Sequence, residues 1–543
     1  MLQISAEEGR IEAKSPLTCT ISNFQASSAP HPMNSSTKEP LIGKIDVVGS
    51  ASSKRVDTEY KRYPWSWKKF WQFTGPGWLM SLAYLDPGNL EADLQQGAYT
   101  NYKLVWVLFA ATAIGLVLQE LSSRLGVVTG EDLAVNSKTY FTKSQSRFLY
   151  VMMEIAIIGS DIQEVLGSAI AIKLLSNNKI DLVWGCLITG LDTFTFLFVH
   201  KCGARYLEAL ICALIFTMAA CFFINWGGVD VDGAELAQGW FIPYVQSYAI
   251  MQAVGTIGAV IMPHNLYLHS GLVQSREVPK EDVGLVKDAN RYFFWEATLA
   301  LTFSYFINLA LVSTFAEYFF DEHCASDNYA CMPDSAFSDS GDMHDPCGDG
   351  FHCGEIGLDT AGPALQHNLG DFGQTMWGLG LLAAGQASTM TATLAGQIVM
   401  GGFLDWKISM WLRVAITRFV ALGPAVFVCL ATADNSGLTN KINEWLNILQ
   451  SVQLPYAMFP LLVIVGNESI MTVHSMKGTY SKICWFLASL ILVVNFYLIL
   501  DFVYLGDGDG DIPDGDGFKF GTGFFLVFYF SSILWIAKQK KVE

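Results

Sequence analysis

The chain has 543 residues, of which 52% are apolar and 15% are charged, and its formal net charge is −17. Soluble domains carry about 25% charged residues, so this composition excludes an ordinary soluble protein and indicates a polytopic membrane protein. The acidic balance excludes nucleic acid as an expected partner and favours the attraction of cations.

The N-terminal segment, residues 1–64, is rich in Ser, Lys, Glu and Pro and contains no long apolar run. This composition predicts a disordered tail, and the segment lacks the apolar core of a secretory signal. Residues 65–540 are predicted to form a single transmembrane transporter domain, embedded in the lipid bilayer.

Apolar stretches of membrane-spanning length recur through this domain and predict about twelve helical spans. Basic residues gather in the loops that follow the even-numbered spans and at the chain end, so these loops and both termini are predicted to face the cytoplasm. The expected spans are residues 70–95, 104–125, 149–175, 182–199, 206–226, 248–273, 293–320, 372–400, 411–431, 445–465, 483–505 and 518–537.

One long loop on the opposite side, residues 321–371, is acidic and holds four cysteines. In an oxidising compartment these cysteines are predicted to form two disulfides. A zinc site that includes His344 and His352 is the alternative. The four cysteines are Cys324, Cys331, Cys347 and Cys353.

A second loop on that side, residues 506–517, alternates Asp and Gly and begins like a calcium-binding EF-hand loop. Ile512 stands where that motif has its turn glycine, and Phe518 stands where it has the bidentate glutamate. We therefore expect a solvated acidic turn rather than a calcium site.

Two of the expected spans are interrupted by proline in the same way. The first span contains Asp86–Asn89, with the letters Asp-Pro-Gly-Asn, and the sixth contains Met262–Asn265, with the letters Met-Pro-His-Asn. Proline removes a backbone donor and breaks a helix. Backbone carbonyls freed at membrane depth are tolerated where they line a cavity or bind a ligand. Matched breaks in the two halves of a chain therefore predict the substrate site of a transporter.

The residues at these breaks predict a metal-ion site of mixed chemistry. Asp86 offers a carboxylate, Asn89 an amide oxygen, and Met262 a thioether sulfur, while unwinding frees carbonyls near Ala83 and Ala259. Adding sulfur to oxygen ligands biases a site from magnesium or calcium toward manganese, iron, cobalt and cadmium. The alternative for the methionine is ordinary core packing.

The third span carries three carboxylates, Glu154, Asp161 and Glu164, whose spacing places them on one helical face. Carboxylates on a buried face predict a path for protons or ions. In the sixth span, His264 and His269 can take up protons near neutral pH, or they can serve as hydrogen-bonded structural residues.

These segments closely resemble the Nramp family of divalent-metal transporters, and the resemblance covers residues 65–537. The two breaks carry most of it. The matching segments are Ser81–Gln96, Asp161–Gly167, Met262–Ser270, Gly385–Thr391 and Leu449–Pro455.

The resemblance implies a LeuT-like all-α fold of two inverted five-helix repeats plus two extra C-terminal helices. It implies proton-coupled import of Mn²⁺ or Fe²⁺, and also of Cd²⁺ or Co²⁺, by alternating access. The metal is cargo and protons are the coupling ion, so no resident cofactor is expected. The family's magnesium- and aluminium-handling branches lack the methionine that this chain keeps.

The resemblance also assigns roles residue by residue. A polar ligand that joins in an occluded state falls on Asn447, with Gln450 as the alternative. The metal ligands fall on Asp86, Asn89, Met262 and the carbonyls of Ala83 and Ala259, and the proton path on Asp161, Glu164, His264, Glu154 and Arg418.

Three other functions are less consistent with the residues. An amino-acid or sodium-coupled symporter of the same fold would leave an open helix N-terminus for a substrate carboxylate, which Asp86 would repel. A metal sensor that does not transport is the second rival. An enzyme is the third, but the sequence shows no nucleophile paired with a base. The plasma membrane and an acidic vacuole or lysosome are both compatible locations, and the oligomeric state is not predicted.

Overall fold

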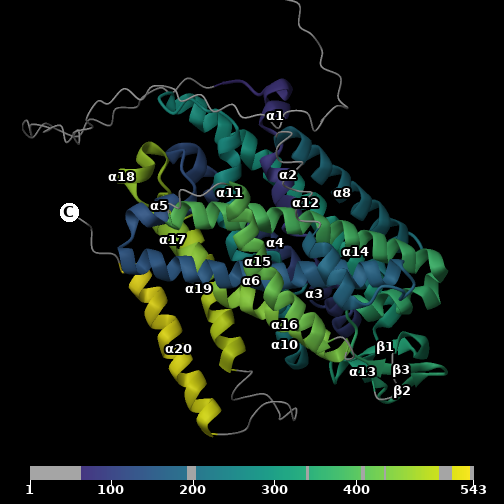
Figure 1. Cartoon of the computed structure of the whole chain (residues 1–543). Coiled ribbons are helices and arrows are strands. Elements are labelled where there is room, and N and C mark those ends of the chain that lie inside the picture. Colours follow the sequence, from purple (N-terminus) through teal and green to yellow (C-terminus); the bar gives the residue numbers. More distant parts are fainter. Residues whose placement is uncertain are drawn as a thin grey trace, which may run out of the picture. The chain divides into compact units, whose positions relative to one another are not determined.

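The computed structural model describes residues 63–191, 204–337, 342–404, 410–432, 436–500 and 516–538, and these form helices with one small β-sheet (Figure 1). Residues 1–62 of the predicted N-terminal tail and residues 506–515 of the Asp- and Gly-rich loop lie outside these residues. The predicted all-α membrane fold is confirmed.

Seven helical segments of the described chain are long and apolar enough to cross a membrane. Three shorter apolar helices accompany them, Leu182–Leu191, Leu422–Ala431 and Gly521–Ala537, so the exact number of spans stays a prediction. The long segments comprise α4 (Val105–Thr129), α6 (Lys143–Leu175), α8 (Ala204–Trp226), α10 (Ile250–Val260) with α11 (Pro263–Leu272), α12 (Val283–Phe319), α16 (Ser436–Gln453) with α17 (Pro455–Val465), and α19 (Gly478–Leu500).

The other elements are shorter or less apolar. They are α1 (Trp67–Phe73), α2 (Pro76–Leu82), α3 (Pro87–Thr100), α5 (Leu133–Tyr140), α9 (Gly233–Phe241), η1 (Ser247–Ala249), η2 (Val273–Ser275), α13 (Glu322–Ala325), η3 (Asp334–Ala336), α14 (Leu358–Leu404), α15 (Met410–Thr432), α18 (Glu468–Met471), η5 (Thr472–His474) and α20 (Asp516–Ala537).

Both predicted helix breaks are present. The first span divides into α2 and α3, and the sixth divides into α10 and α11, with proline at the first position of each second half. Helix α3 packs against α10, and α2 packs against α11. The two breaks therefore lie side by side, although about 170 residues separate them in the sequence.

Backbone carbonyls at the first break accept hydrogen bonds from side chains of α12, which packs along α2 and α3. The Ser304 hydroxyl donates to the Ser81 carbonyl at 3.0 Å, and the Asn308 amide donates to the Tyr84 carbonyl at 3.0 Å. Buried backbone acceptors need such partners. Two polar residues on one helix thus hold the unwound segment open.

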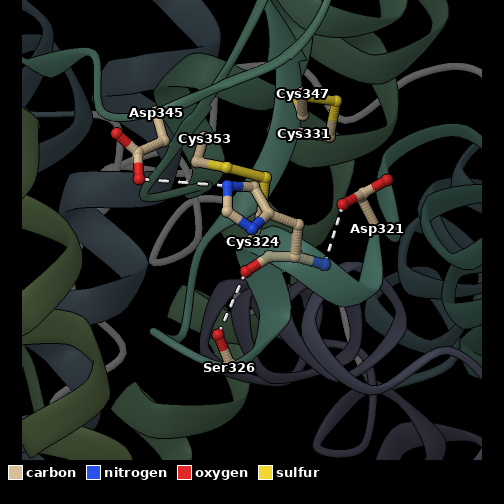
Figure 2. Close-up of a disulfide and its surroundings, with 8 residues drawn as sticks. Asp321, Cys324, Ser326, Cys331, Asp345, Cys347 and Cys353 are labelled. Atoms are coloured by element: carbon tan, nitrogen blue, oxygen red, sulfur yellow. Dashed lines mark hydrogen bonds and ion pairs between the residues drawn. A yellow bond between two sulfur atoms is a disulfide. The ribbon is translucent and has the colours of Figure 1, made fainter.

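The Cys-rich loop folds into a three-stranded antiparallel sheet of order β1 (Ala330–Pro333), β3 (Phe351–Gly354), β2 (Pro346–Gly348). Figure 2 shows its two disulfides, Cys324–Cys353 and Cys331–Cys347. The prediction of two disulfides is confirmed.

Because the disulfides use all four sulfur atoms, the alternative zinc site with His344 and His352 is wrong. The His344 ring stacks on Tyr329, and the His352 Nδ1 lies 2.8 Å from an Asp334 carboxylate oxygen. A third disulfide, Cys186–Cys429, joins the helix Leu182–Leu191 to α15 and was not predicted.

The C-terminal part of the predicted loop 321–371 is helical, since α14 begins at Leu358. The helix is kinked at Gly370, whose φ is 69°, a conformation that favours glycine. Polar residues on both sides of this kink interrupt the apolar pattern, which is why the sequence places the start of the span after it.

Candidate functional site

The first break is organised by Asp86, which is the N-cap residue of α3. Its Oδ1 accepts hydrogen bonds from the Asn89 backbone nitrogen at 3.0 Å and from the Asn89 Nδ2 at 2.6 Å. Aspartate favours this position because it satisfies an unpaired backbone donor of the first turn. Both side chains are fully buried, and among the described residues neither the second Asp86 oxygen nor the Asn89 Oδ1 has a hydrogen-bond partner.

A single amide group connects the two breaks. The Asn89 Nδ2, already bonded to Asp86, also donates to the Ala259 carbonyl at 2.9 Å. Ala259 lies in the last turn of α10, and Ala83 is the C-cap residue of α2. A carboxylate and a carbonyl from opposite halves of the chain thus point toward one position, which a partly positive NH₂ group fills.

The second break places Met262 at the N-cap of α11, where its side chain makes no capping hydrogen bond. The side chain is 2% exposed. Its sulfur lies 3.9 Å from the Ser160 hydroxyl, and that hydroxyl is also 3.1 Å from the Glu164 carboxylate on α6. A serine hydroxyl has one hydrogen to donate, so it serves one of these acceptors at a time.

Helix α16 approaches the first break through Asn447. Its Nδ2 donates to the Gly88 carbonyl at 3.1 Å, and its Oδ1 accepts from the Gln163 Nε2 at 2.8 Å. The alternative residue Gln450 instead donates to the Ala156 carbonyl on α6 at 2.7 Å. The structure therefore brings Asn447, rather than Gln450, to the first turn of α3.

The predicted proton-path residues differ in how deeply their side chains are buried. Asp161 and Glu164 are fully buried on α6, whereas Glu154, two turns earlier, is only partly buried. His264 and His269 are buried in α11. Arg418 lies in α15, and its side chain is outside what the structure describes.

Three residues near the site were missed by sequence reasoning: Ser160, Gln163 and Asp93. Ser160 and Gln163 gave no signal beyond their positions next to Asp161 and Glu164. Asp93 follows Asp86 by seven residues on α3, which places it on the same helical face. It is fully buried, and among the described residues neither carboxylate oxygen has a hydrogen-bond partner. This spacing could have identified it.

Two broken helices that meet at buried, incompletely bonded polar atoms define a membrane transporter built from inverted repeats. The chain belongs to the Nramp family: the family model described as "Natural resistance-associated macrophage protein-like" matches residues 77–501.

Curated relatives support this membership. Metal transporter Nramp3 of Arabidopsis thaliana is 45% identical over 442 residues, which cover 81% of each chain. Metal transporter nramp1 homolog of Dictyostelium discoideum is 45% identical over 471 residues, which cover 86% of this chain and 79% of the relative. A crystal structure of the Eremococcus coleocola manganese transporter, in a variant form, is 25% identical with a TM-score of 0.71, and the match covers 88% of this chain and 96% of that one.

Proposed function

We propose that this protein carries Mn²⁺ or Fe²⁺ into the cytoplasm by alternating access, with protons as the coupling ion. The observation that supports this most is the convergence of Asp86, Asn89 and the Ala259 carbonyl between two broken helices. The relatives are named metal transporters, and the similar solved structure is a manganese transporter.

The cation is proposed to occupy the position that the Asn89 amide NH₂ now fills. Both acceptors of that group, the Asp86 carboxylate and the Ala259 carbonyl, are oxygen ligands. Rotation of the amide would turn the Asn89 Oδ1 toward the same ion and add a third oxygen. Since a divalent ion is costly to bury without a counter-charge, Asp86 is the ligand that the site requires most.

Met262 and the Ala83 carbonyl are proposed to complete the ligand set. Met262 follows Ala259 by three residues, and its sulfur provides the soft ligand that separates Mn²⁺ and Fe²⁺ from Ca²⁺ and Mg²⁺. Asn447 is the proposed additional ligand of the occluded state, because it already contacts the Gly88 carbonyl between Asp86 and Asn89.

Proton coupling is assigned to Asp161 and Glu164. The Ser160 hydroxyl lies between the Glu164 carboxylate and the Met262 sulfur, so a change at the metal site can reach a titratable group through one side chain. When an ion draws the methionine sulfur toward itself, the Ser160 hydrogen is left to Glu164 alone, which stabilises the carboxylate form and favours proton release.

The decisive experiment is uptake of radioactive Mn²⁺ by proteoliposomes with an inwardly directed proton gradient, in competition with Fe²⁺, Ca²⁺ and Mg²⁺. We expect saturable Mn²⁺ uptake that Fe²⁺ inhibits at low concentration and that Ca²⁺ and Mg²⁺ inhibit only in large excess. Binding without uptake would identify a sensor, and uptake of amino acids or sodium in place of metal would identify the rival symporter.

A further inference from the structure

A polar stripe on α16 extends well beyond the proposed metal site. Its side chains, spaced by three and four residues, lie on one helical face that packs against α3, α6 and α10. Two of them, Asn440 and Asn443, are 3% and 1% exposed. Among the described residues, neither the oxygen nor the nitrogen of either amide has a hydrogen-bond partner. The stripe consists of Asn440, Asn443, Asn447 and Gln450.

Buried amides without partners are uncommon, because each unpaired polar atom loses its hydration without compensation. Four such atoms on neighbouring turns of one helix favour a partner from outside the described residues, such as water or an ion. Asn443 is also joined to the metal site: the Gln163 amide donates to the Asn443 carbonyl at 3.1 Å and to the Asn447 Oδ1 at 2.8 Å.

The segment that links β3 to α14, residues 355–358, covers this end of the stripe, and Figure 1 shows α16 running toward the small sheet. The segment is hydrogen-bonded to α3. The Leu358 nitrogen donates to Glu91 at 2.9 Å, and the Ile356 nitrogen donates to the Tyr99 hydroxyl at 3.1 Å. A Cβ placed on Gly357 would lie 1.8 Å from the Asn440 Oδ1, so glycine is required for this close approach.

Carboxylates surround the same place. Glu91 on α3 is fully buried beneath the segment. Glu444 follows Asn443 directly on α16, and its Oε1 accepts from the Gln252 amide on α10 at 3.2 Å. Glu355 lies 3.8 Å from the Lys441 ammonium. Amides and carboxylates from three helices thus meet below the disulfide-bonded sheet, on the side that we assign to the exterior.

We propose that this place is an outer binding station for the incoming divalent cation, with Asn440 and Asn443 as amide ligands and Glu91 and Glu444 as the source of negative charge. The station rests on the proposed transport function and extends it. Its ligands are all oxygen atoms, so it captures Mn²⁺, Ca²⁺ and Mg²⁺ alike. Selection by sulfur then occurs further in, after the ion passes along Asn447 to Asp86.

The first test compares Mn²⁺ uptake kinetics of Asn440→Leu and Asn443→Leu, which keep the side-chain size and remove the amide. We expect KM to rise about tenfold, the equivalent of about 1.4 kcal/mol in ion capture, with kcat near the wild-type value. Asn443→Asp adds charge and should lower KM. The matched control is Asn225→Leu on α8, where a buried asparagine with an unpaired Oδ1 lies outside the stripe.

The second test measures Mn²⁺ binding to the full-length Asp86→Ala protein by electron paramagnetic resonance. We expect weak binding to remain, to be displaced by Ca²⁺, and to disappear when Asn440→Leu and Asn443→Leu are added. Absence of residual binding, or binding that the leucines do not change, would overturn the station.

The outcomes separate this inference from the transport function itself. If wild-type protein takes up no Mn²⁺, the proposed function fails. If wild type transports while the asparagine variants retain its KM, only the station fails. Should a leucine variant not fold, Asn443→Asp decides the question, and an unchanged KM in that variant contradicts the station.

Discussion

The two helix breaks have the same design but use different residues at the position that matters. Asp86 and Met262 are both N-cap residues, each is followed by proline, and each precedes an asparagine by three residues. Asp86 accepts a hydrogen bond from the backbone nitrogen of Asn89. At the second break the Met262 side chain forms no cap, and the Asn265 nitrogen donates to the Met262 backbone carbonyl at 3.2 Å.

The difference shows which of the two residues helix capping can explain and which one needs a functional reason. Aspartate is among the best N-cap residues, so helix α3 alone would explain Asp86. Methionine cannot cap, and a serine or aspartate there would stabilise α11 by about 1 kcal/mol. Since Met262 violates the local preference at a buried site, we infer that its sulfur is kept for binding. Departures from local rules of this kind concentrate at functional sites.

The largest expected effect comes from Asp86→Asn. Asparagine caps a helix as well as aspartate, so folding should persist while the negative charge is lost. We expect Mn²⁺ uptake to fall to background, with a melting temperature close to that of the wild type. The control is Asp132→Asn, the same exchange at the N-cap of α5, where Asp132 accepts from the Val135 nitrogen at 2.9 Å. Retained Mn²⁺ uptake in Asp86→Asn would show that the Asp86 carboxylate is not an essential metal ligand.

Glu164→Gln and Asp161→Asn test whether proton release from α6 is coupled to metal binding at Met262. Glutamine still accepts from Ser160 but cannot release a proton. We expect that Mn²⁺ uptake by these variants no longer increases when the external pH is lowered. Their affinity for Mn²⁺ should change only slightly. Glu154→Gln, at a partly exposed position, should have a smaller effect. Lost metal affinity together with an unaltered pH profile would instead assign Glu164 to the metal site.

Met262→Ala should change the selectivity among divalent cations more than the rate of Mn²⁺ transport. The variant keeps every oxygen ligand and gains room for water, so hard cations can bind. We expect a modest loss of Mn²⁺ transport, a larger loss of Cd²⁺ affinity and stronger competition by Ca²⁺ or Mg²⁺ than in the wild type, measured in the same vesicles. An unchanged preference for Mn²⁺ over Ca²⁺ would show that the sulfur does not select.

The smallest expected effect is a difference in thermal stability between Met262→Ser and Met262→Ala. Both substitutions remove the thioether and its burial, but only serine can cap α11. Serine should therefore give the more stable variant by about 1 kcal/mol, seen as a higher thermal midpoint. Equal thermal midpoints would mean that a capping residue at position 262 does not stabilise α11. The absence of a cap at Met262 would then be no evidence for a binding role.

The sequence predicts the breaks well, because proline inside an apolar stretch of membrane length has few interpretations. It predicts Asp86, Asn89 and Met262 as candidate ligands from their chemistry alone. It cannot choose between Asn447 and Gln450, which lie on one face of α16, since the choice depends on the Gly88 carbonyl of another helix.

Side-chain partners across the fold are the part that sequence reasoning misses. Ser160 becomes notable only when α6 and α11 are seen together. The disulfide pairing has the same origin, because four cysteines allow three pairings. Cys331 lies opposite Cys353 in the sheet, yet it bonds to Cys347.

The most direct test of a site shared by both breaks is X-ray absorption spectroscopy of Cd²⁺ bound to the purified wild-type protein and to Met262→Ala. We expect one sulfur among oxygen neighbours in the wild type, and oxygen neighbours alone in the variant. A first shell made only of oxygen or nitrogen in the wild-type protein would contradict the assignment of Met262 and with it the account of the second break.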